Sequence, residues 1–272
     1  MGYTRQAYYK NRADRVRRLE DLKVVRDQVM SIRGIMPRLG TRKLYYLIKP
    51  LMDKQSIKMG RDTLFNFLRA EHLLIRPRKT YTRTTNSKHW LKKYPNLTKT
   101  LVITKPEQLW VTDITYLKTT EGNMYLNMIT DAYSRKIVGY SVSNGMEASS
   151  MVPALKMALQ ARIYKHTLVH HSDRGLQYCS REYTDIAVGA NLRISMTENG
   201  DPYENALAER MNRTIKEEFL LDEIRASAGN TKKIIDQSIY TYNHKRPHLA
   251  LNFKTPESLH RRKNPGRQRQ PG

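Results

Sequence analysis

The first quarter of the chain carries apolar residues at helical spacing. Between residues 14 and 35 they recur every three or four positions, the repeat of one helix face. These residues are Val16, Leu19, Leu22, Val25, Val29 and Ile32. A second helix is expected from Gly40 and Thr41, with a buried stripe made of Leu44, Leu47, Ile48 and Leu51. A third is expected over residues 62–71, with Leu64, Phe65 and Leu68 facing inward.

The second and third of these helices, joined by a short polar segment, are compatible with a helix-turn-helix whose last helix enters a DNA major groove. Any small helical bundle has the same spacing. After residue 75 the periodicity stops, and an extended basic linker is expected over residues 76–105. Its cations could follow phosphates while Tyr81, Trp90 or Tyr94 stack on a base, but anchoring of these aromatics on the protein surface is equally compatible with the pattern.

From residue 106 the pattern is typical of strands. Runs at 109–117, 124–130 and 136–142, separated by short turns, predict an antiparallel meander. A helix over 148–163 follows, in which Pro153 is tolerable as a first-turn residue. Next come a strand at 167–171, a helix near 180–190, a strand at 192–197 and a long helix over about 204–221. This order predicts a mixed β-sheet flanked by helices, an α/β domain over residues 106–229.

A last helix, over about 231–243, leads into a basic tail, and together they form a C-terminal extension over residues 230–272. The tail is rich in Pro, Gly and charge, so it is expected to be disordered without a partner. With the all-α region at 1–75 and the linker at 76–105, the sequence predicts four parts.

Charge is distributed unevenly over these parts. The 272 residues hold 49 Lys and Arg against 25 Asp and Glu, a formal net charge of +24. Residues 1–104 contribute +18, residues 105–229 contribute −2 and residues 230–272 contribute +8. Such an excess favours a polyanionic partner, with nucleic acid ahead of an anionic membrane surface. Basic flanks that only aid solubility are the weaker alternative.

Two other classes of protein are excluded by composition. No apolar run approaches the roughly 20 residues that a membrane helix needs, so no membrane partner is expected. The single cysteine, Cys179, cannot form an internal disulfide or a Cys-rich zinc cluster, which fits a reducing, cytoplasmic compartment. Four histidines lie near each other in the sequence, His170 with His171 and His244 with His248, but without a cysteine pair a structural zinc site is not expected.

Three carboxylates have positions that suggest chemistry. Asp113 is inside the first strand, where an uncompensated carboxylate is costly, and Asp173 follows the fourth strand. Glu209 is on the last long helix, on one stripe with Asn205, Arg213 and Lys216. Each alone also has a structural interpretation, as a hydrogen-bonded strand residue, a turn residue or a solvated helix charge. The nearby hydroxyls of Tyr116 and Ser172 have no evident activating base and are read as packing or loop residues.

The sequence segments around these carboxylates resemble those of a known family. WVTDITY, HSDRGLQY and NALAERMNRTIKEE, with YNHKRPHLALNFKTPE at 242–257, are similar to transposases of the IS3 group of insertion sequences, within the DDE transposases and retroviral integrases. In that family 35 residues separate the second and third acidic residues and a basic residue follows seven positions later, as Asp173, Glu209 and Lys216 do here. The resemblance is strong over 105–258 and looser over 36–100.

The resemblance implies an RNase H-like fold and a metal-dependent reaction on DNA. Two divalent cations, Mg²⁺ with Mn²⁺ as a substitute, would lie about 4 Å apart and activate the attacking and leaving oxygens. Asp113 would bridge both ions, Asp173 would hold one and Glu209 the other. The implied function is a transposase that cleaves at the 3′ ends of an insertion sequence and transfers them to target DNA.

The resemblance also implies partners. Arg213 and Lys216 would contact DNA next to the scissile bond. Asn205 could orient Glu209, contact the substrate or cap the helix. Further DNA contacts are expected from basic residues of the helical domain and the linker, namely Arg42, Lys43, Arg76, Arg78 and Lys79. The implied partners are double-stranded transposon ends and target DNA, further copies of the chain on that DNA, and an upstream helix-turn-helix and leucine-zipper protein or fusion. The expected place is the bacterial cytoplasm, in association with the nucleoid.

Two other functions remain open on the residues alone. The chain could be a non-catalytic DNA-binding regulator derived from a transposase. It could also be a nuclease on the same fold that selects branched or hybrid structures and cuts without joining.

Overall fold

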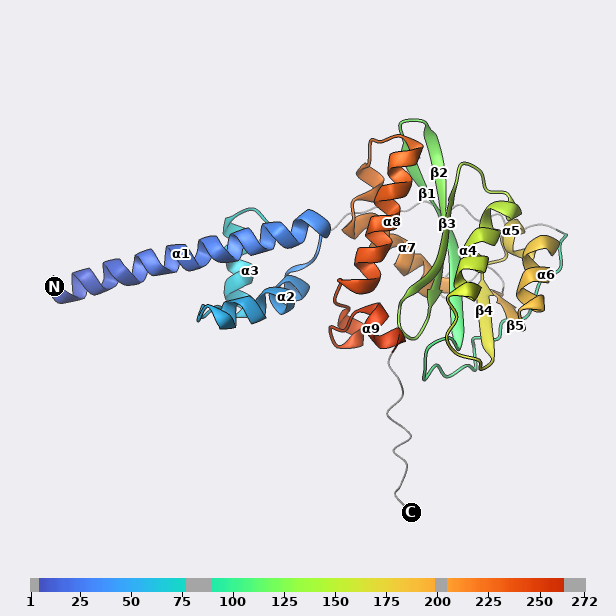
Figure 1. Ribbon diagram of the computed structural model, residues 1–272, viewed down its shortest axis with the longest axis horizontal. Coiled ribbons are helices and arrows are strands. Elements are labelled where there is room, and N and C mark those ends of the chain that lie inside the picture. Colours follow the sequence, from blue (N-terminus) through green and yellow to red (C-terminus); the bar gives the residue numbers. More distant parts are fainter. Residues whose placement is uncertain (1–4, 77–89, 199–204, 262–272) are drawn as a thin grey trace, which may run out of the picture. The chain divides into compact units, whose positions relative to one another are not determined.

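The chain divides into two units, Met1–Arg78 and Lys79–Gly272, in a computed structural model that describes residues 5–76, 90–198 and 205–261 (Figure 1). Arg78, Lys79, Tyr81 and the predicted disordered tail from residue 262 onward lie outside the described residues. No helix in the described ranges is long and apolar enough to cross a membrane.

The first unit is all-helical, as predicted, with α1 over Arg5–Ile35, α2 over Thr41–Lys54 and α3 over Arg61–Ala70. Its core is made of aliphatic side chains from the second half of α1 and from α2 and α3. These residues are Val25, Val29, Ile32, Leu44, Ile48, Met52, Leu64 and Leu68.

The apolar face of α1 and the predicted inward face of α3 are only partly buried. Val16, Leu19 and Phe65 are exposed by 50, 61 and 39%. At 1.5 Å per residue, α2 and α3 are about 21 and 15 Å long, whereas α1 is about 46 Å long. The short helices therefore cover only the second half of α1, and Figure 1 shows its first half extending beyond them.

The second unit is built on a five-stranded mixed sheet in the order β3-β2-β1-β4-β5. Strands β1 (Leu109–Thr119), β2 (Gly122–Asp131) and β3 (Ile137–Ser143) form the predicted antiparallel meander. Strands β4 (Leu168–Ser172) and β5 (Leu192–Met196) add to it in parallel on the side of β1. The predicted α/β class and its mixed sheet are confirmed.

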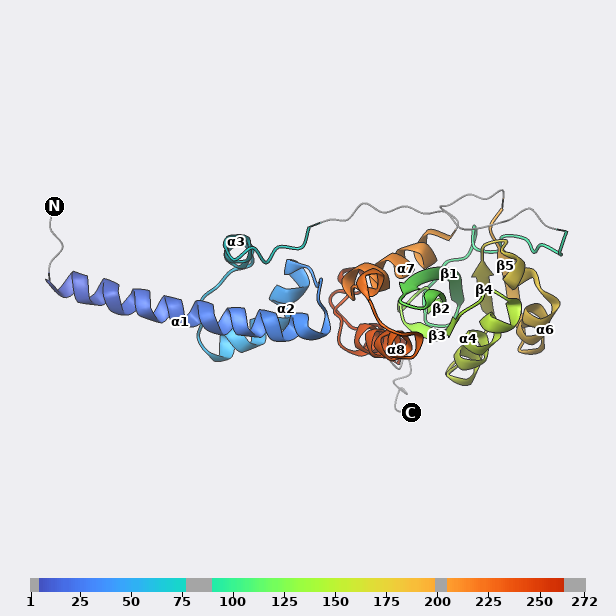
Figure 2. The same cartoon turned by 90° about the horizontal axis from the view of Figure 1, so that it is seen from above.

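Helices cover both faces of this sheet (Figure 2). On one face lie α4 (Ala148–Gln160), α5 (Leu176–Cys179) and α6 (Arg181–Gly189), and on the other lie α7 (Ala206–Glu218) and α8 (Ala228–His244). The 3-10 turns η2 (Leu221–Glu223) and η3 (Leu249–Leu251) and the short helix α9 (Pro256–His260) complete the unit. The predicted element boundaries differ from the observed ones by a few residues, because helix and strand ends are the least specific part of a hydrophobic pattern.

Two segments that the sequence placed outside the α/β domain pack on it. From residue 90 the predicted linker lies against the sheet unit: Leu91 and Tyr94 contact the core cluster under α4, and Leu97 contacts the cluster under α7. Trp90, in contrast, is 91% exposed. In α8, Asn243 accepts from the Ile137 N–H at 3.0 Å and donates to its carbonyl at 2.9 Å. The part of the predicted C-terminal extension up to residue 261 therefore completes the sheet unit.

A buried polar cluster fastens α9 to the start of the sheet. Glu107, Asp131 and His260 are each at most 1% exposed. The Nε2 of His260 lies 3.3 Å from Glu107 Oε1, and its Nδ1 lies 2.9 Å from Ser134 Oγ and 3.7 Å from Asp131 Oδ1. Asp131 also accepts from the Glu107 N–H at 2.7 Å. Although burial lowers the pKa of His260, the Asp131 and Glu107 carboxylates raise it above its ordinary 6.5.

The stability of the sheet unit should therefore depend on His260 protonation. Because the pKa of His260 is raised by folding, its contribution is fully present below the unfolded pKa and is lost as the pH rises through the folded pKa. We expect the difference in melting temperature between the wild type and His260→Gln to be largest near pH 6 and to shrink toward pH 9. Thermal unfolding at a series of pH values checks this. A difference that grew with pH would contradict it.

Gly139 allows α4 to approach β3. A Cβ built on Gly139 would lie 2.2 Å from the carbonyl oxygen of Ala154 and 2.9 Å from the Cβ of Ala158. Gly139→Ala should lower the free energy of unfolding by about 1–3 kcal/mol, because the helix must move away from the sheet. Urea unfolding followed by tryptophan fluorescence measures this, since Trp90 and Trp110 both belong to the second unit. Gly189→Ala is the matched control: its Cβ would meet nothing within 4 Å, so no loss is expected.

Candidate active site

The parallel pairing of β1 and β4 sets two of the predicted carboxylates side by side. Val111 is the register partner of His171, and continuing the register by two residues on each chain places Asp113 beside Asp173. Neighbouring strands lie about 4.8 Å apart. Side chains alternate along a strand, so both carboxylates share a face with Val111, which packs under α7. Asp173 additionally accepts from the Gly175 N–H at 3.0 Å.

The electrostatics of Asp113 reflect this arrangement. The pKa of Asp113 is raised to about 8, by burial first, then by the Asp173 carboxylate and, to a smaller extent, by Glu209. Hydrogen bonds from the Ile114 backbone and from Asn212 act in the opposite direction without cancelling the shift. A carboxyl group with so strong a shift, next to two further carboxylates, is a feature typical of functional sites.

Glu209 reaches this region from α7, where it is exposed. Asn205, at the start of α7, is buried, and its Nδ2 donates to the Thr112 carbonyl at 3.2 Å rather than capping the helix through its side chain. Arg213 was predicted to lie on the same helix stripe as Asn205 and Glu209, but in the structure Asn212 takes this place. Arg213 is exposed, whereas Asn212 is buried and its Nδ2 donates to Asp113 Oδ2 at 2.9 Å.

Asn212 is a site residue that sequence reasoning missed. The only available signal was its position three residues after Glu209, which places both on neighbouring parts of one helix face.

Asp173 and Glu209 are each within electrostatic range of Asp113. Among the residues that the structure describes, no three His, Cys, Asp or Glu side chains are grouped tightly enough to hold one metal ion together. Two ions that each rest on two carboxylates, with water or substrate oxygens completing the coordination, do not require such a group. The donor set of three carboxylates fits hard divalent cations.

Lys216 contacts the protein itself. Its Nζ donates to the Tyr116 carbonyl at 3.0 Å and to Thr115 Oγ1 at 3.3 Å, and it forms an ion pair with Asp222 at 3.1 Å. It also lies 4.9 Å from the centre of the Tyr116 ring. These contacts join α7 to β1, and they differ from the DNA contact that the family resemblance implies.

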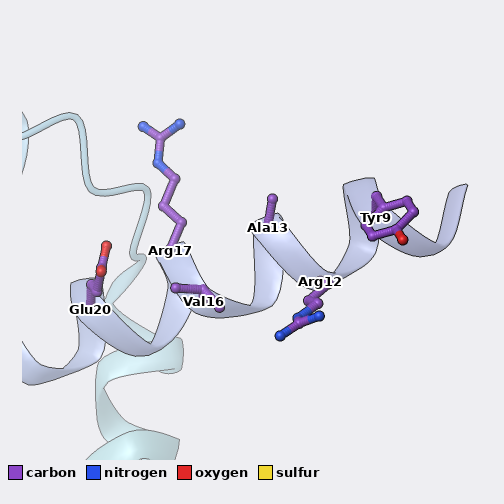
Figure 3. A pocket seen from close by; sticks show the side chains of 6 residues that line it. All are labelled: Tyr9, Arg12, Ala13, Val16, Arg17 and Glu20. Atoms are coloured by element: carbon purple, nitrogen blue, oxygen red, sulfur yellow. The ribbon is translucent and has the colours of Figure 1, made fainter. Parts of the chain in front are cut away.

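The other residues predicted to contact DNA differ in their exposure to solvent. Arg42 and Arg76 are exposed in the first unit, and the Arg76 carbonyl accepts from Arg38 at 2.5 Å. Lys43 is only 9% exposed, which does not favour a phosphate contact. The exposed first half of α1 also carries cations, and Figure 3 shows Arg12 and Arg17 projecting to opposite sides of this helix.

The histidines and hydroxyls singled out by the sequence are engaged in packing contacts. His170 Nε2 lies 2.8 Å from Tyr183 Oη, His171 Nδ1 lies 2.8 Å from Ser195 Oγ, and the His244 ring stacks on Tyr240. Burial lowers the pKa of His170 to about 3, so it remains neutral. Ser172 Oγ donates to the Asp173 carbonyl at 2.8 Å.

Comparison with known proteins places this fold in a class. Two family models, both described as integrase core domain, match residues 103–202 and 190–256. One solved structure, of the simian T-cell lymphotropic virus intasome in complex with PP2A regulatory subunit B56 gamma, is similar in fold with a TM-score of 0.51. It is 16% identical and covers 89% of this chain and 77% of that chain. The second unit is therefore an integrase catalytic core.

Relatives with closer sequences define the family. The chain is 35% identical to the insertion element IS600 uncharacterized 31 kDa protein of Shigella sonnei, over 81% of this chain and 80% of the relative. It is 34% identical to the transposase for insertion sequence element IS904 of Lactococcus lactis, over 63% of this chain and 71% of the relative. It is 38% identical to the transposase InsF for insertion sequence IS3A of Escherichia coli, over 50% of this chain and 46% of the relative. The chain belongs to the insertion-sequence transposases with a DDE-type integrase core, and it is a DNA transposase, a polynucleotidyl transferase.

A buried polar network lies on the opposite face of β1 from Asp113. Tyr178 Oη donates to Asn127 Oδ1 at 2.8 Å, Thr112 Oγ1 donates to the same oxygen at 3.0 Å, and the two hydroxyls are 3.2 Å apart. All three side chains are at most 2% exposed. The network links α5 to β1 and β2 directly beneath the strand that carries Asp113.

Removing one hydroxyl from this network should cost stability. Tyr178→Phe leaves Asn127 with a single donor, so we expect a loss of about 1–2 kcal/mol in the free energy of unfolding. Urea unfolding measures the loss. Tyr240→Phe, on the exposed side of α8, keeps the stacking on His244 and should be neutral. Equal stability of Tyr178→Phe and the wild type would show that the network does not stabilise the fold.

Proposed function

We propose that this transposase cuts and joins DNA strands with Asp113, Asp173 and Glu209 as ligands of two divalent cations, Mg²⁺ or Mn²⁺. The observation that supports this most is the Asp113 carboxyl group, whose pKa is raised to about 8 by burial and by its neighbouring carboxylates. Such a group requires either a proton or a cation. A divalent cation next to several carboxylates would relieve their mutual repulsion and provide the positive charge that a phosphate oxygen seeks.

Each of the three carboxylates would have its own role as an ion ligand. Asp113, lying beside Asp173 on one side and facing α7 on the other, is suited to bridge two ions, with Asp173 holding one and Glu209 the other. Bound ions would activate the attacking oxygen of water or a 3′-hydroxyl and stabilise the leaving oxygen. The Ser172 hydroxyl, already engaged with the Asp173 carbonyl, is poorly placed as a nucleophile, which favours direct transfer without a covalent protein intermediate.

The substrates we propose are the ends of the insertion sequence and the target DNA. Cleavage would expose 3′ ends, and the same site would transfer them, with several copies of the chain assembled on the DNA. The first unit, with its basic excess, would hold phosphates in a salt-sensitive manner through residues such as Arg42 and Arg76. An upstream helix-turn-helix and leucine-zipper partner or fusion would add recognition of the inverted repeats. The reaction would take place in the cytoplasm, on the nucleoid.

A strand-transfer assay tests this function with one substrate. A precut duplex with a free 3′-hydroxyl and Mg²⁺ or Mn²⁺ should yield joined products. Cleavage without joining would indicate a structure-selective nuclease, and binding without either reaction would indicate a regulator.

The three carboxylates should be needed for both reactions. Asp113→Asn, Asp173→Asn and Glu209→Gln each remove a charged ligand, and we expect losses of about 10²–10³-fold or more in cleavage and in joining. Retention on DNA should change little, because phosphate contacts lie elsewhere. Asp185→Asn, an exposed carboxylate on α6, is the matched control and should retain both reactions. Normal joining by any of the three variants would remove that residue from the site.

A further inference from the structure

Trp90 is the most exposed large apolar side chain among the residues that the structure describes, at 91%. The residues that follow it are packed, because Leu91 and Tyr94 both contact the core cluster under α4. An indole can bury about 150–250 Å², and at Trp90 the fold uses almost none of that area. The fold therefore anchors the backbone next to Trp90 and leaves the indole available to a ligand.

Backbone contacts place this segment near the candidate active site. The Pro95 carbonyl accepts from the Met196 N–H at 3.4 Å, on the outer edge of β5. Met196 is the register partner of Ser172, the residue before Asp173. Since neighbouring strands lie about 4.8 Å apart, Pro95 is about two strand spacings, or about 10 Å, from the end of β4. Figure 2 shows the segment beside β5.

Trp90 is less than one turn of B-DNA away from the carboxylates. It precedes Pro95 by five residues, which span at most about 18 Å when fully extended. With the spacing from Pro95 to β4, Trp90 lies within about 30 Å of the end of that strand. One turn of B-DNA is about 34 Å long. DNA whose scissile bond lies at Asp173 can therefore contact Trp90 with the adjoining turn.

The segment around Trp90 is cationic. The chain has no Asp or Glu over residues 72–106, and both Lys92 and Lys93 are exposed. Cations beside an exposed aromatic ring are the combination that binds a nucleic-acid strand, because the cations attract phosphates and the ring stacks on a base. A purely apolar partner would match the indole but not the two lysines.

Lys93 connects this segment to the candidate active site. Burial raises the pKa of the Cys179 thiol to about 11, and the Asp173 carboxylate raises it as well. Lys93 and Arg174 act in the opposite direction. Because the effect of a charge fades over about 10 Å in salt solution, Lys93 and Asp173 both lie near this thiol. A DNA strand that passes Lys93 therefore lies close to the strand end that carries Asp173.

We propose that Trp90 stacks on an unpaired base of the DNA end while Lys93 holds a neighbouring phosphate. This rests on the proposed function in that a DNA end is taken as the substrate, and it adds the form in which that end is bound. An indole stacks on any base whose face is open, but bases inside a duplex are covered by their neighbours. A frayed end or a single-stranded flank fits this site, and the interior of a duplex does not.

DNA binding without divalent metal tests the contact apart from catalysis. The probes are a duplex with a single-stranded flank of about five nucleotides and the same strand fully paired with its complement. We expect Trp90→Leu to weaken binding of the flanked duplex by about 5- to 100-fold and binding of the paired duplex by less than about twofold. Trp90→Phe keeps an aromatic ring and should restore most of the affinity.

The lysine is tested by the salt dependence of binding. Lys93→Gln should weaken binding of the flanked duplex and reduce the salt slope by about one, because one phosphate contact is lost. Two exposed residues serve as matched controls and should bind like the wild type: Val102→Ala in the same segment, where Val102 is 76% exposed, and Lys156→Gln on α4.

Trp90 also reports on the contact by its fluorescence. The chain has two tryptophans, and Trp110 is fully buried. In the wild type, the flanked duplex should lower the tryptophan emission and protect it from quenching by acrylamide. Trp90→Leu, which retains only Trp110, should show neither change. Melting temperatures equal to that of the wild type confirm that the variants are folded.

The proposal is overturned if Trp90→Leu binds the flanked duplex as tightly as the wild type does, or if both duplexes lose affinity equally. A wild-type emission that does not respond to the flanked duplex also overturns it. A wild type that shows the stacking contact but neither cuts nor joins DNA would contradict the proposed function alone. A wild type that joins DNA ends, with Trp90→Leu binding and joining equally well, would contradict the stacking contact alone.

Discussion

The site depends on the parallel register between β1 and β4. Because Val111 pairs with His171, carrying the register two residues further places Asp113 beside Asp173, the first residue after β4, on the same face of the sheet. A slip of one residue would turn one carboxylate to the opposite face and separate the pair. The register thus creates an electrostatic conflict: together with burial, the neighbouring Asp173 carboxylate raises the pKa of Asp113 to about 8.

The composition of α7 follows from that conflict. A helix that covers a sheet face normally presents apolar residues to it, and α7 does so with Met211 and Ile215, which are buried. Over Asp113 an apolar residue would leave the carboxylate with only the backbone donor of Ile114, and removing one hydrogen-bond partner of a buried polar group costs about 1–3 kcal/mol. Asn212 provides an N–H there without adding a charge that would compete with a cation. The polar stripe of α7 is therefore a consequence of the carboxylate pair beneath it.

The sequence predicted the elements well and the contacts between them poorly. Alternation over 109–117 reveals a strand and which of its residues share a face, but no periodicity in one strand tells which residue of β4 lies beside Asp113. Likewise, the apolar spacing at Val16 and Leu19 shows that α1 has a face, but not that its partners α2 and α3 are too short to cover it. The contact of Asn212 with Asp113 and the partners of Lys216 could not be predicted from the sequence for the same reason. They depend on a strand about 100 residues away, and amides are too common on helices to signal a role.

Glu107 and Asp113 show what distinguishes the site from the rest of the core. Both carboxyl groups belong to the same neighbourhood of β1, and burial raises the pKa of each. For Glu107, hydrogen bonds from His260 and from the backbone of Ile163 and Tyr164 reverse the shift, and its pKa is lowered. The fold can therefore stabilise a buried carboxylate fully when the group is structural. At Asp113 it provides fewer donors and adds two more carboxylates, so part of the stability of the sheet unit is sacrificed where a cation would restore it.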